Sequence, residues 1–136
     1  MGLIIDTNVF IDAENGRFDL KGLARFSDYG ISYISVITVS ELYSGIHLAK
    51  TAEQRIRRSV FVENIISNMP ILNINFDVAK IYAELYAHVL GHGKRAGTNV
   101  HDLQIAATAI SGNHVVLTRN IKDFDSIPGV RFESLF

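Results

Sequence analysis

The sequence places a set of oxygen-bearing side chains where they could form one reactive site. Its members are Asp6, Glu41, Asp102, Asn120 and Asp123. Asp6 directly follows the apolar run Leu3–Ile5, so a carboxylate stands at the end of an expected buried strand. Glu41 lies on the first turns of an expected helix, with Ser35 and Thr38 as candidate caps. Asp102 begins another helix, where the helix dipole favours an acid.

Carboxylates that meet at one site repel one another. A pair about 4 Å apart costs about 4 kcal/mol at an effective dielectric constant of about 20, which equals roughly three pKa units. One acid therefore keeps a proton unless a cation neutralises the group. Oxygen ligands in a chain with 0 cysteines suit a hard ion, so Mg²⁺, or else Mn²⁺, is the expected cofactor. Such an ion activates water and balances charge on a phosphate, which is the chemistry of phosphodiester hydrolysis.

Short apolar runs alternate with helical patterns along the chain and predict strands joined by helical crossovers. The expected strands are 3–5, 31–35, 71–74, 114–118 and 130–132, and the expected helices are 39–49, 52–66, 77–90 and 102–110. This order predicts an α/β fold with a mainly parallel five-stranded sheet. Ligands bind outside the carboxyl ends of parallel strands, so the acids are expected to gather at that edge. Each acid alone has an ordinary explanation, as a helix cap or an exposed charge, and only their shared edge favours a site.

Composition and charge narrow the class of protein. The chain has 136 residues, 48% hydrophobic and 20% charged, which suits a single domain over residues 1–136. No apolar run approaches the roughly eighteen residues of a membrane span, and no secretory signal is recognisable, so we expect no membrane association. The lack of cysteine agrees with a reducing compartment, and the cytoplasm is the expected location. A net charge of −1 argues against nucleic-acid binding through the whole surface but leaves room for a local basic patch.

Four segments of the chain together resemble one known family. They read LIIDTNVF, SVITVSELYSG, HDLQIAATAI and VVLTRNIKDFDSIPGV. In order, spacing and overall length they resemble the motif blocks of PIN-domain ribonucleases, and in particular the VapC-type toxins of bacterial toxin–antitoxin pairs. One block would be weak evidence, but four in order between residues 3 and 130 are specific.

The resemblance implies a three-layer α/β/α sandwich in which Asp6, Glu41 and Asp102 bind Mg²⁺. It implies an endoribonuclease, a hydrolase that cleaves transfer, ribosomal or messenger RNA and so inhibits translation and growth. It also implies restraint by a cognate VapB-like antitoxin whose C-terminal tail enters the active-site groove, in a homodimer or in a heterotetramer or octamer with that antitoxin. Some relatives carry a fourth acid at the position of Asn120, and others an amide there and an acid at the position of Asp123. Both assignments stay open from sequence.

Further residues are expected to support the acids or to hold RNA. Thr7, Asn8 and Thr118 could orient the first carboxylate. Lys94 and Arg95 precede the third block and are expected near Asp102, where they could bind RNA phosphates. His101 adjoins Asp102 and could touch the substrate.

Two other functions are compatible with acids at strand ends. A phospho-acceptor signalling module of the receiver type also binds Mg²⁺ there, but it requires adjacent acids after the first strand and a lysine at a later strand end. The chain instead has Asp6-Thr7-Asn8 and Thr118-Arg119-Asn120. A catalytically silent RNA-binding PIN domain is the other alternative, and the intact acids argue against it.

Overall fold

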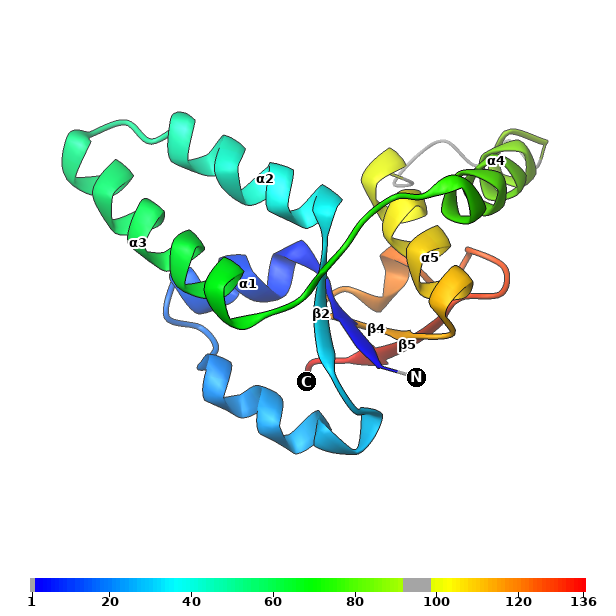
Figure 1. Ribbon diagram of the computed structural model, residues 1–136, viewed down its shortest axis with the longest axis horizontal. Helices are drawn as coiled ribbons and strands as arrows, with labels where there is room; N and C mark the ends of the chain where they lie inside the picture. The colour runs from blue at the N-terminus through cyan, green and yellow to red at the C-terminus, as the bar shows by residue number, and fades with distance from the viewer. Residues whose placement is uncertain (1, 92–98) are drawn as a thin grey trace.

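The computed structural model describes residues 2–91 and 99–136. Its strands are β1 (Leu3–Ile5), β2 (Ser32–Ser35), β3 (Ile71–Leu72), β4 (Val115–Thr118) and β5 (Arg131–Ser134). Its α-helices are α1 (Thr7–Glu14), α2 (Val36–His47), α3 (Ala52–Asn68), α4 (Phe76–Gly91) and α5 (Val100–Gly112), and η1 (Leu20–Tyr29) and η2 (Ile121–Asp123) are 3-10 helices (Figure 1). Within these ranges no helix is both long enough and apolar enough to cross a bilayer.

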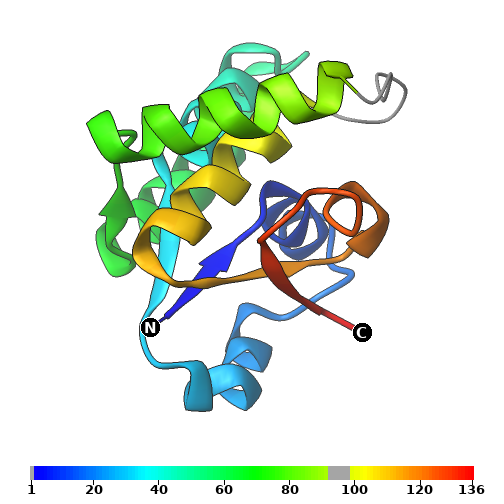
Figure 2. The same ribbon diagram turned by 90° about the vertical axis from the view of Figure 1, so that its right-hand side faces the viewer.

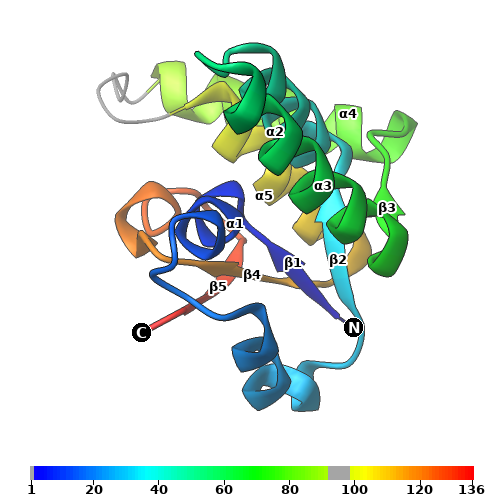
Figure 3. The ribbon, with the colours of Figure 1, turned by 90° about the vertical axis from the view of Figure 1, so that its left-hand side faces the viewer.

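The strands form one sheet with the order β3-β2-β1-β4-β5 in the described part of the chain. β1 lies at its centre, where Ile4 stands opposite Tyr33 of β2 and Val116 of β4 (Figure 3). Every pairing in this sheet is parallel. The carboxyl ends of all its strands therefore lie at the same edge, which is the arrangement expected from the sequence.

Alternate residues of the central strand face opposite sides of the sheet. Leu3 and Ile5 pack in one core with residues of α1, α2 and α3, whereas Ile4 packs in a second core with residues of α4 and α5. All three side chains are fully buried. In Figure 2, α4 and α5 cover one face of the sheet and η1 lies on the other. The expected α/β/α sandwich is confirmed.

The helices α1 and η1 are not among those predicted from the sequence. α1 has eight residues, several of them β-branched or otherwise poor helix formers, so propensity alone does not predict it. Two tertiary features stabilise it instead. Asp6 is its N-cap, and Val9 and Phe10 are both 0% exposed in the core beneath it.

The expected start of the helix that carries Glu41 is partly wrong. α2 begins at Val36, and Ser35 caps it by accepting a hydrogen bond from the N–H of Ile37 at 3.1 Å. Thr38 therefore lies inside the helix and is not a cap. α5 likewise begins before Asp102, at Val100, with Asn99 as its N-cap. Asp102 thus lies in the first turn, where its charge still meets the positive end of the helix dipole.

The packing of α1 can be tested with two neighbouring residues. Phe10 is 0% exposed and Ile11 is 44% exposed. We expect Phe10→Ala to lower the free energy of unfolding by about 3–5 kcal/mol, because it leaves a cavity in the core. Ile11→Ala is the matched control and should cost no more than about 1 kcal/mol. Urea denaturation followed by circular dichroism measures both, and equal losses would contradict this packing.

Candidate active site

Asp6 stands at the junction of β1 and α1, in the centre of the carboxyl edge. Its backbone N–H donates to the carbonyl of Leu117 in β4 at 2.9 Å, which continues the sheet to this residue. Its Oδ1 accepts a hydrogen bond from the N–H of Thr7 at 2.8 Å as the cap of α1. The residue is only 4% exposed. The same carboxylate therefore caps α1 and lies at the carboxyl edge of the sheet, where the sequence predicts the site.

The hydroxyl of Thr118, at the end of β4, holds the second oxygen of Asp6. Thr118 Oγ1 donates to Asp6 Oδ2 at 2.8 Å. It accepts a hydrogen bond from the N–H of Asn120 at 3.0 Å and from Asn8 Nδ2 at 3.3 Å. Because Thr118 is fully buried, this small network fixes Asp6 and the start of the following loop together.

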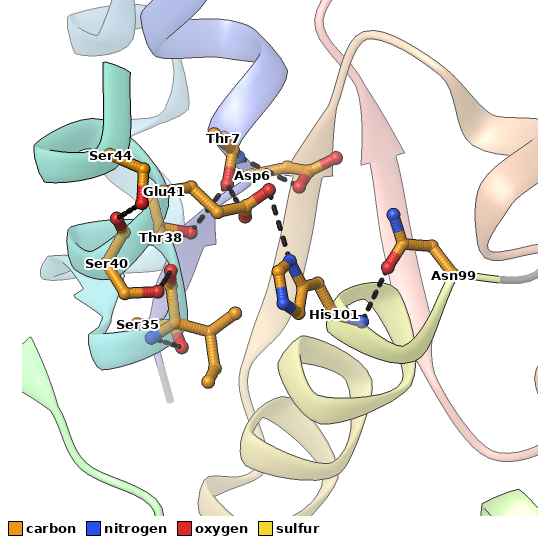
Figure 4. Close-up of polar contacts among 10 residues, drawn as sticks. Asp6, Thr7, Ser35, Thr38, Ser40, Glu41, Ser44, Asn99 and His101 are labelled. Atoms are coloured by element: carbon orange, nitrogen blue, oxygen red, sulfur yellow. Dashed lines mark hydrogen bonds and ion pairs between the residues drawn. The ribbon is translucent and has the colours of Figure 1, made fainter. Parts of the chain in front are cut away.

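A second hydroxyl network holds Glu41, which points from α2 toward Asp6 in Figure 4. Thr7 Oγ1 donates to Glu41 Oε1 at 2.7 Å and lies 2.9 Å from Thr38 Oγ1. A hydroxyl has one hydrogen, so Thr38 must donate to Thr7 when Thr7 donates to Glu41. The resulting chain orients Glu41 through two buried hydroxyls, one on α1 and one on α2.

His101 reaches Glu41 from α5. Its Nδ1 lies 3.3 Å from Glu41 Oε2, on the oxygen that Thr7 does not use (Figure 4). The backbone N–H of His101 donates to Asn99 Oδ1 at 2.7 Å, which holds the first turn of α5. The two side chains are 44% and 30% exposed, so this contact lies at the open side of the site. The third expected acid, Asp102, is the next residue of the same turn.

The carboxylates act on one another electrostatically. Burial raises the pKa of Asp6 to about 6, against hydrogen bonds from Thr118 and Thr7 that lower it, and the charges of Glu41 and Asp123 raise it further. Burial also raises the pKa of Asp102 to about 7, with added contributions from Asp6, Asp123 and Glu41. The acids of four separate parts of the chain therefore lie close enough for their charges to act on the pKa values of Asp6 and Asp102. Without a neutralising cation, Asp6 and Asp102 retain protons well above the usual range of a carboxylic acid.

The donor set fits a hard divalent cation. The three expected metal ligands, Asp6, Glu41 and Asp102, are carboxylates, and a cation would stabilise the ionised form of the acids whose pKa is raised. In the described ranges, no three acidic or histidine side chains already form a closed metal-binding group. Ion binding would therefore require adjustment of side chains such as Glu41, which is partly exposed.

The two candidates for the fourth position differ in their placement. Asp123 lies in η2, and its charge contributes to the raised pKa of both Asp6 and Asp102. Asn120 immediately precedes η2, and its backbone N–H donates a hydrogen bond to Thr118 Oγ1. Its side chain is exposed and makes no hydrogen bond that caps η2. The charge of Asp123 thus acts on the other carboxylates, whereas the contact of Asn120 with the site is made by its backbone. Lys94 and Arg95 lie outside the described residues.

Sequence reasoning gave no role to Asp12 and Arg119, which lie beside the site. Asp12 is 1% exposed, and its Oδ1 accepts a hydrogen bond from Arg119 Nη1 at 2.7 Å. Asn8, one helical turn before Asp12, accepts the backbone N–H of Arg119 at 3.2 Å. The i, i+4 spacing of Asn8 and Asp12 would have shown a shared face, had α1 been predicted. The capping position of Asp6 before Val9 and Phe10 was the available signal for that helix.

Comparison with known proteins identifies the family. The PIN-domain model matches residues 3–130. A ribonuclease VapC of Rickettsia bellii is 38% identical over 128 residues, which cover 94% of this chain and 92% of that protein. The chain belongs to the VapC family of PIN-domain ribonucleases. The resemblance seen in the four sequence blocks is confirmed.

Solved VapC-family structures share this fold over the full chain. VapBC2 from Rickettsia felis, bound to a DNA fragment from its promoter, superimposes with a TM-score of 0.88 at 25% identity and covers 100% of both chains. DNA-bound VapBC from Salmonella typhimurium gives a TM-score of 0.84 at 26% identity and covers 98% of both chains. The expected PIN-like architecture is therefore confirmed.

The raised pKa values predict how stability depends on pH in the presence of EDTA. Asp6 and Asp102 have folded pKa values of about 6 and about 7, above the 3.8 of an ordinary Asp, so between these values the folded state binds more protons than the unfolded one. The free energy of unfolding should therefore fall as the pH rises from 5 to 8. Asp6→Asn should remove about 1 kcal/mol of that fall.

Urea denaturation at several pH values measures this effect. The matched control is Asp77→Asn, because Asp77 is an exposed acid in the first turn of α4. That variant should keep the wild-type pH dependence. A profile for Asp6→Asn as steep as that of the wild type would show that Asp6 is ionised normally.

Proposed function

We propose that this VapC-family chain is a Mg²⁺-dependent endoribonuclease in which Asp6, Glu41 and Asp102 hold the ion and Asp123 completes the acidic group. The observation that carries the proposal is the convergence of these acids from the end of β1 and from α2, α5 and η2, with the pKa of Asp6 and Asp102 raised by burial and by the neighbouring charges. Oxygen-only ligands favour Mg²⁺, and Mn²⁺ would bind the same ligands.

The chain's own residues would act mainly by positioning. Asp6 is held through Thr7 and Thr118, and Glu41 through Thr7 and His101, so each acid is oriented while retaining lone pairs. When bound, Mg²⁺ would supply an activated water and positive charge opposite the scissile phosphate. His101 lies at the open side of the site, where it could contact RNA, and Lys94 and Arg95 are proposed to do the same. Cleavage would leave a 3′-hydroxyl and a 5′-phosphate.

The cleavage assay is the direct test of this proposal. The purified chain should cut 5′-labelled RNA when Mg²⁺ is present, and EDTA should abolish the cut. Asp6→Asn should lower the rate by roughly 100-fold or more, because it removes an ionised ligand. Asp77→Asn is the control and should cleave like the wild type. Equal activity of Asp6→Asn, or full activity in EDTA, would overturn the metal assignment.

The same assay separates the remaining alternatives. RNA binding without any cleavage would indicate the catalytically silent domain. The receiver-type module has lost support because the chain belongs to the VapC family, and stable labelling by a small phosphodonor would be needed to restore it. Transfer, ribosomal and messenger RNA should each be offered as substrate, with mapping of the new 5′ ends.

We also propose that the chain is the toxin of a toxin–antitoxin pair and acts in the cytoplasm, where a VapB-like antitoxin binds it and restrains cleavage. The related structures in Rickettsia felis and Salmonella typhimurium are VapBC complexes. In this chain, Leu48, Ile56 and Val60 of the α2–α3 hairpin are 76%, 65% and 67% exposed. Ile56 and Val60 lie one helical turn apart on α3, and large exposed apolar side chains on one face are typical of a protein-contact surface. A homodimer, or a heterotetramer or octamer with the antitoxin, would be the resulting assembly.

A charge introduced on α3 tests whether this surface binds the antitoxin. We expect Ile56→Asp combined with Val60→Asp to weaken the complex with the purified VapB-like protein by more than about tenfold, because it buries charge at the contact. Phe76→Asp changes an equally exposed apolar residue on α4 and is the control. Isothermal calorimetry measures the affinities. Unchanged affinity of the α3 variant would place the antitoxin elsewhere.

A further inference from the structure

We propose that Arg119 is a phosphate-binding residue at the rim of the active site, and that the buried Asp12 is the positioning residue that holds its guanidinium there. The inference rests on the proposed nuclease function and extends it. It assigns a cation supplied by the protein itself to a site whose other named groups are mostly acids.

The buried carboxylate of Asp12 is held by arginine. It is 1% exposed, and its Oδ1 lies 2.7 Å from Arg119 Nη1 and 3.5 Å from Arg17 Nη1. Its Oδ2 is buried and has no hydrogen-bond partner among the residues that the structure describes. Loss of the Arg119 contact would leave this carboxylate with only the longer contact to Arg17, which is costly in a buried position. The guanidinium is therefore fixed rather than free to move with solvent.

The backbone of Arg119 is fixed as well. Its N–H donates to Asn8 Oδ1 at 3.2 Å. The preceding residue, Thr118, donates directly to Asp6 Oδ2. Arg119 is thus connected to Asp6 through the neighbouring Thr118. It is connected to α1 through its contacts with Asn8 and Asp12. This rigidity is what a preorganised substrate contact requires.

The rest of the guanidinium is available to a ligand. Only Nη1 is used by Asp12, and Nε and Nη2 make no hydrogen bond within the described residues. The side chain is 40% exposed. A planar guanidinium with unused donors matches two oxygens of a phosphate, which lysine cannot do in the same way. An arginine already oriented by a buried acid loses little conformational entropy when it binds.

The charge of Arg119 acts on the acidic group. Burial raises the pKa of Asp123, and the positive charge of Arg119 opposes this shift. Asp123 in turn acts on Asp6 and Asp102, so the guanidinium lies beside the cluster and not on a distant surface. Four acids together repel the phosphates of RNA, and a fixed cation beside them reduces that repulsion. The competing explanation is a clamp that only joins α1 to the end of β4.

Binding of a short fluorescent RNA in EDTA tests the proposal independently of cleavage. Arg119→Gln should raise the Kd at least about fivefold and lower the slope of log Kd against log salt by roughly 0.7, the value of one phosphate contact on single-stranded RNA. Arg131→Gln is the matched control, because Arg131 lies at the opposite end of the same strand pair. In the Mg²⁺ cleavage assay, Arg119→Gln should raise KM more than it lowers kcat.

A double-mutant cycle tests the role of Asp12. Asp12→Asn should raise the Kd and KM in the wild-type background, and it should have no further effect once Arg119 is Gln. Arg119→Lys should restore part of the salt slope, because it keeps the charge. If Arg119→Gln alone does not fold, the double variant with Asp12→Asn, which removes the uncompensated buried charge, provides the measurement.

The outcomes separate this proposal from the proposed function. Unchanged Kd and salt slope in Arg119→Gln, with a loss only of stability or kcat, would overturn the phosphate contact and leave the clamp. If Arg119→Gln changes the Kd and the salt slope as expected but the wild-type chain does not cleave RNA, the phosphate contact is supported and the nuclease function is overturned. Cleavage by the wild type, together with an unchanged Kd and salt slope in Arg119→Gln, would support the nuclease function and overturn the phosphate contact.

Discussion

The mutual repulsion of carboxylates at one edge of a parallel sheet is the constraint on which this structure depends. Parallel strands bring their carboxyl ends together, so the acids that follow them meet whether or not their charges are compatible. Asp6 and Asp102 respond with pKa values of about 6 and about 7. The clustered carboxylates are therefore stabilised by added positive charge. Bound protons supply part of that charge, and a divalent cation would supply more of it.

Hydrogen bonds from neutral hydroxyls and backbone N–H groups stabilise the buried acids in place of ion pairs with lysine or arginine. Thr7, Thr38 and Thr118 come from three elements, and their hydroxyls connect Asp6 and Glu41 to the core. A hydroxyl orients a carboxylate without cancelling its charge, so the acid can still bind a cation. A lysine or arginine at the same positions would stabilise the acids and remove that capacity. Arg119 is instead directed to Asp12.

The short helix α1 connects the two halves of the site. It begins at the residue that caps it, Asp6, and carries Thr7 toward Glu41 and Asn8 toward the end of β4. Its stability comes from the burial of Val9 and Phe10 and from its cap rather than from helix propensity. Packing beneath the sheet edge therefore controls the geometry of groups on top of it. This dependence explains how a core residue can affect a site that it does not touch.

The strands, the longer helices, the edge at which the acids gather and the family could all be predicted from the sequence, because alternating apolar runs and four ordered motif blocks are local patterns of residues. The sequence left open Asn120 against Asp123, and it missed α1, η1, the position of Thr38 and the pairing of Asp12 with Arg119. The tertiary structure shows α1, η1, the place of Thr38 inside α2, and the contact between Asp12 and Arg119. The partners in that last pair lie 107 positions apart, and a short helix that depends on burial and a cap carries too weak a propensity to be read from its own residues.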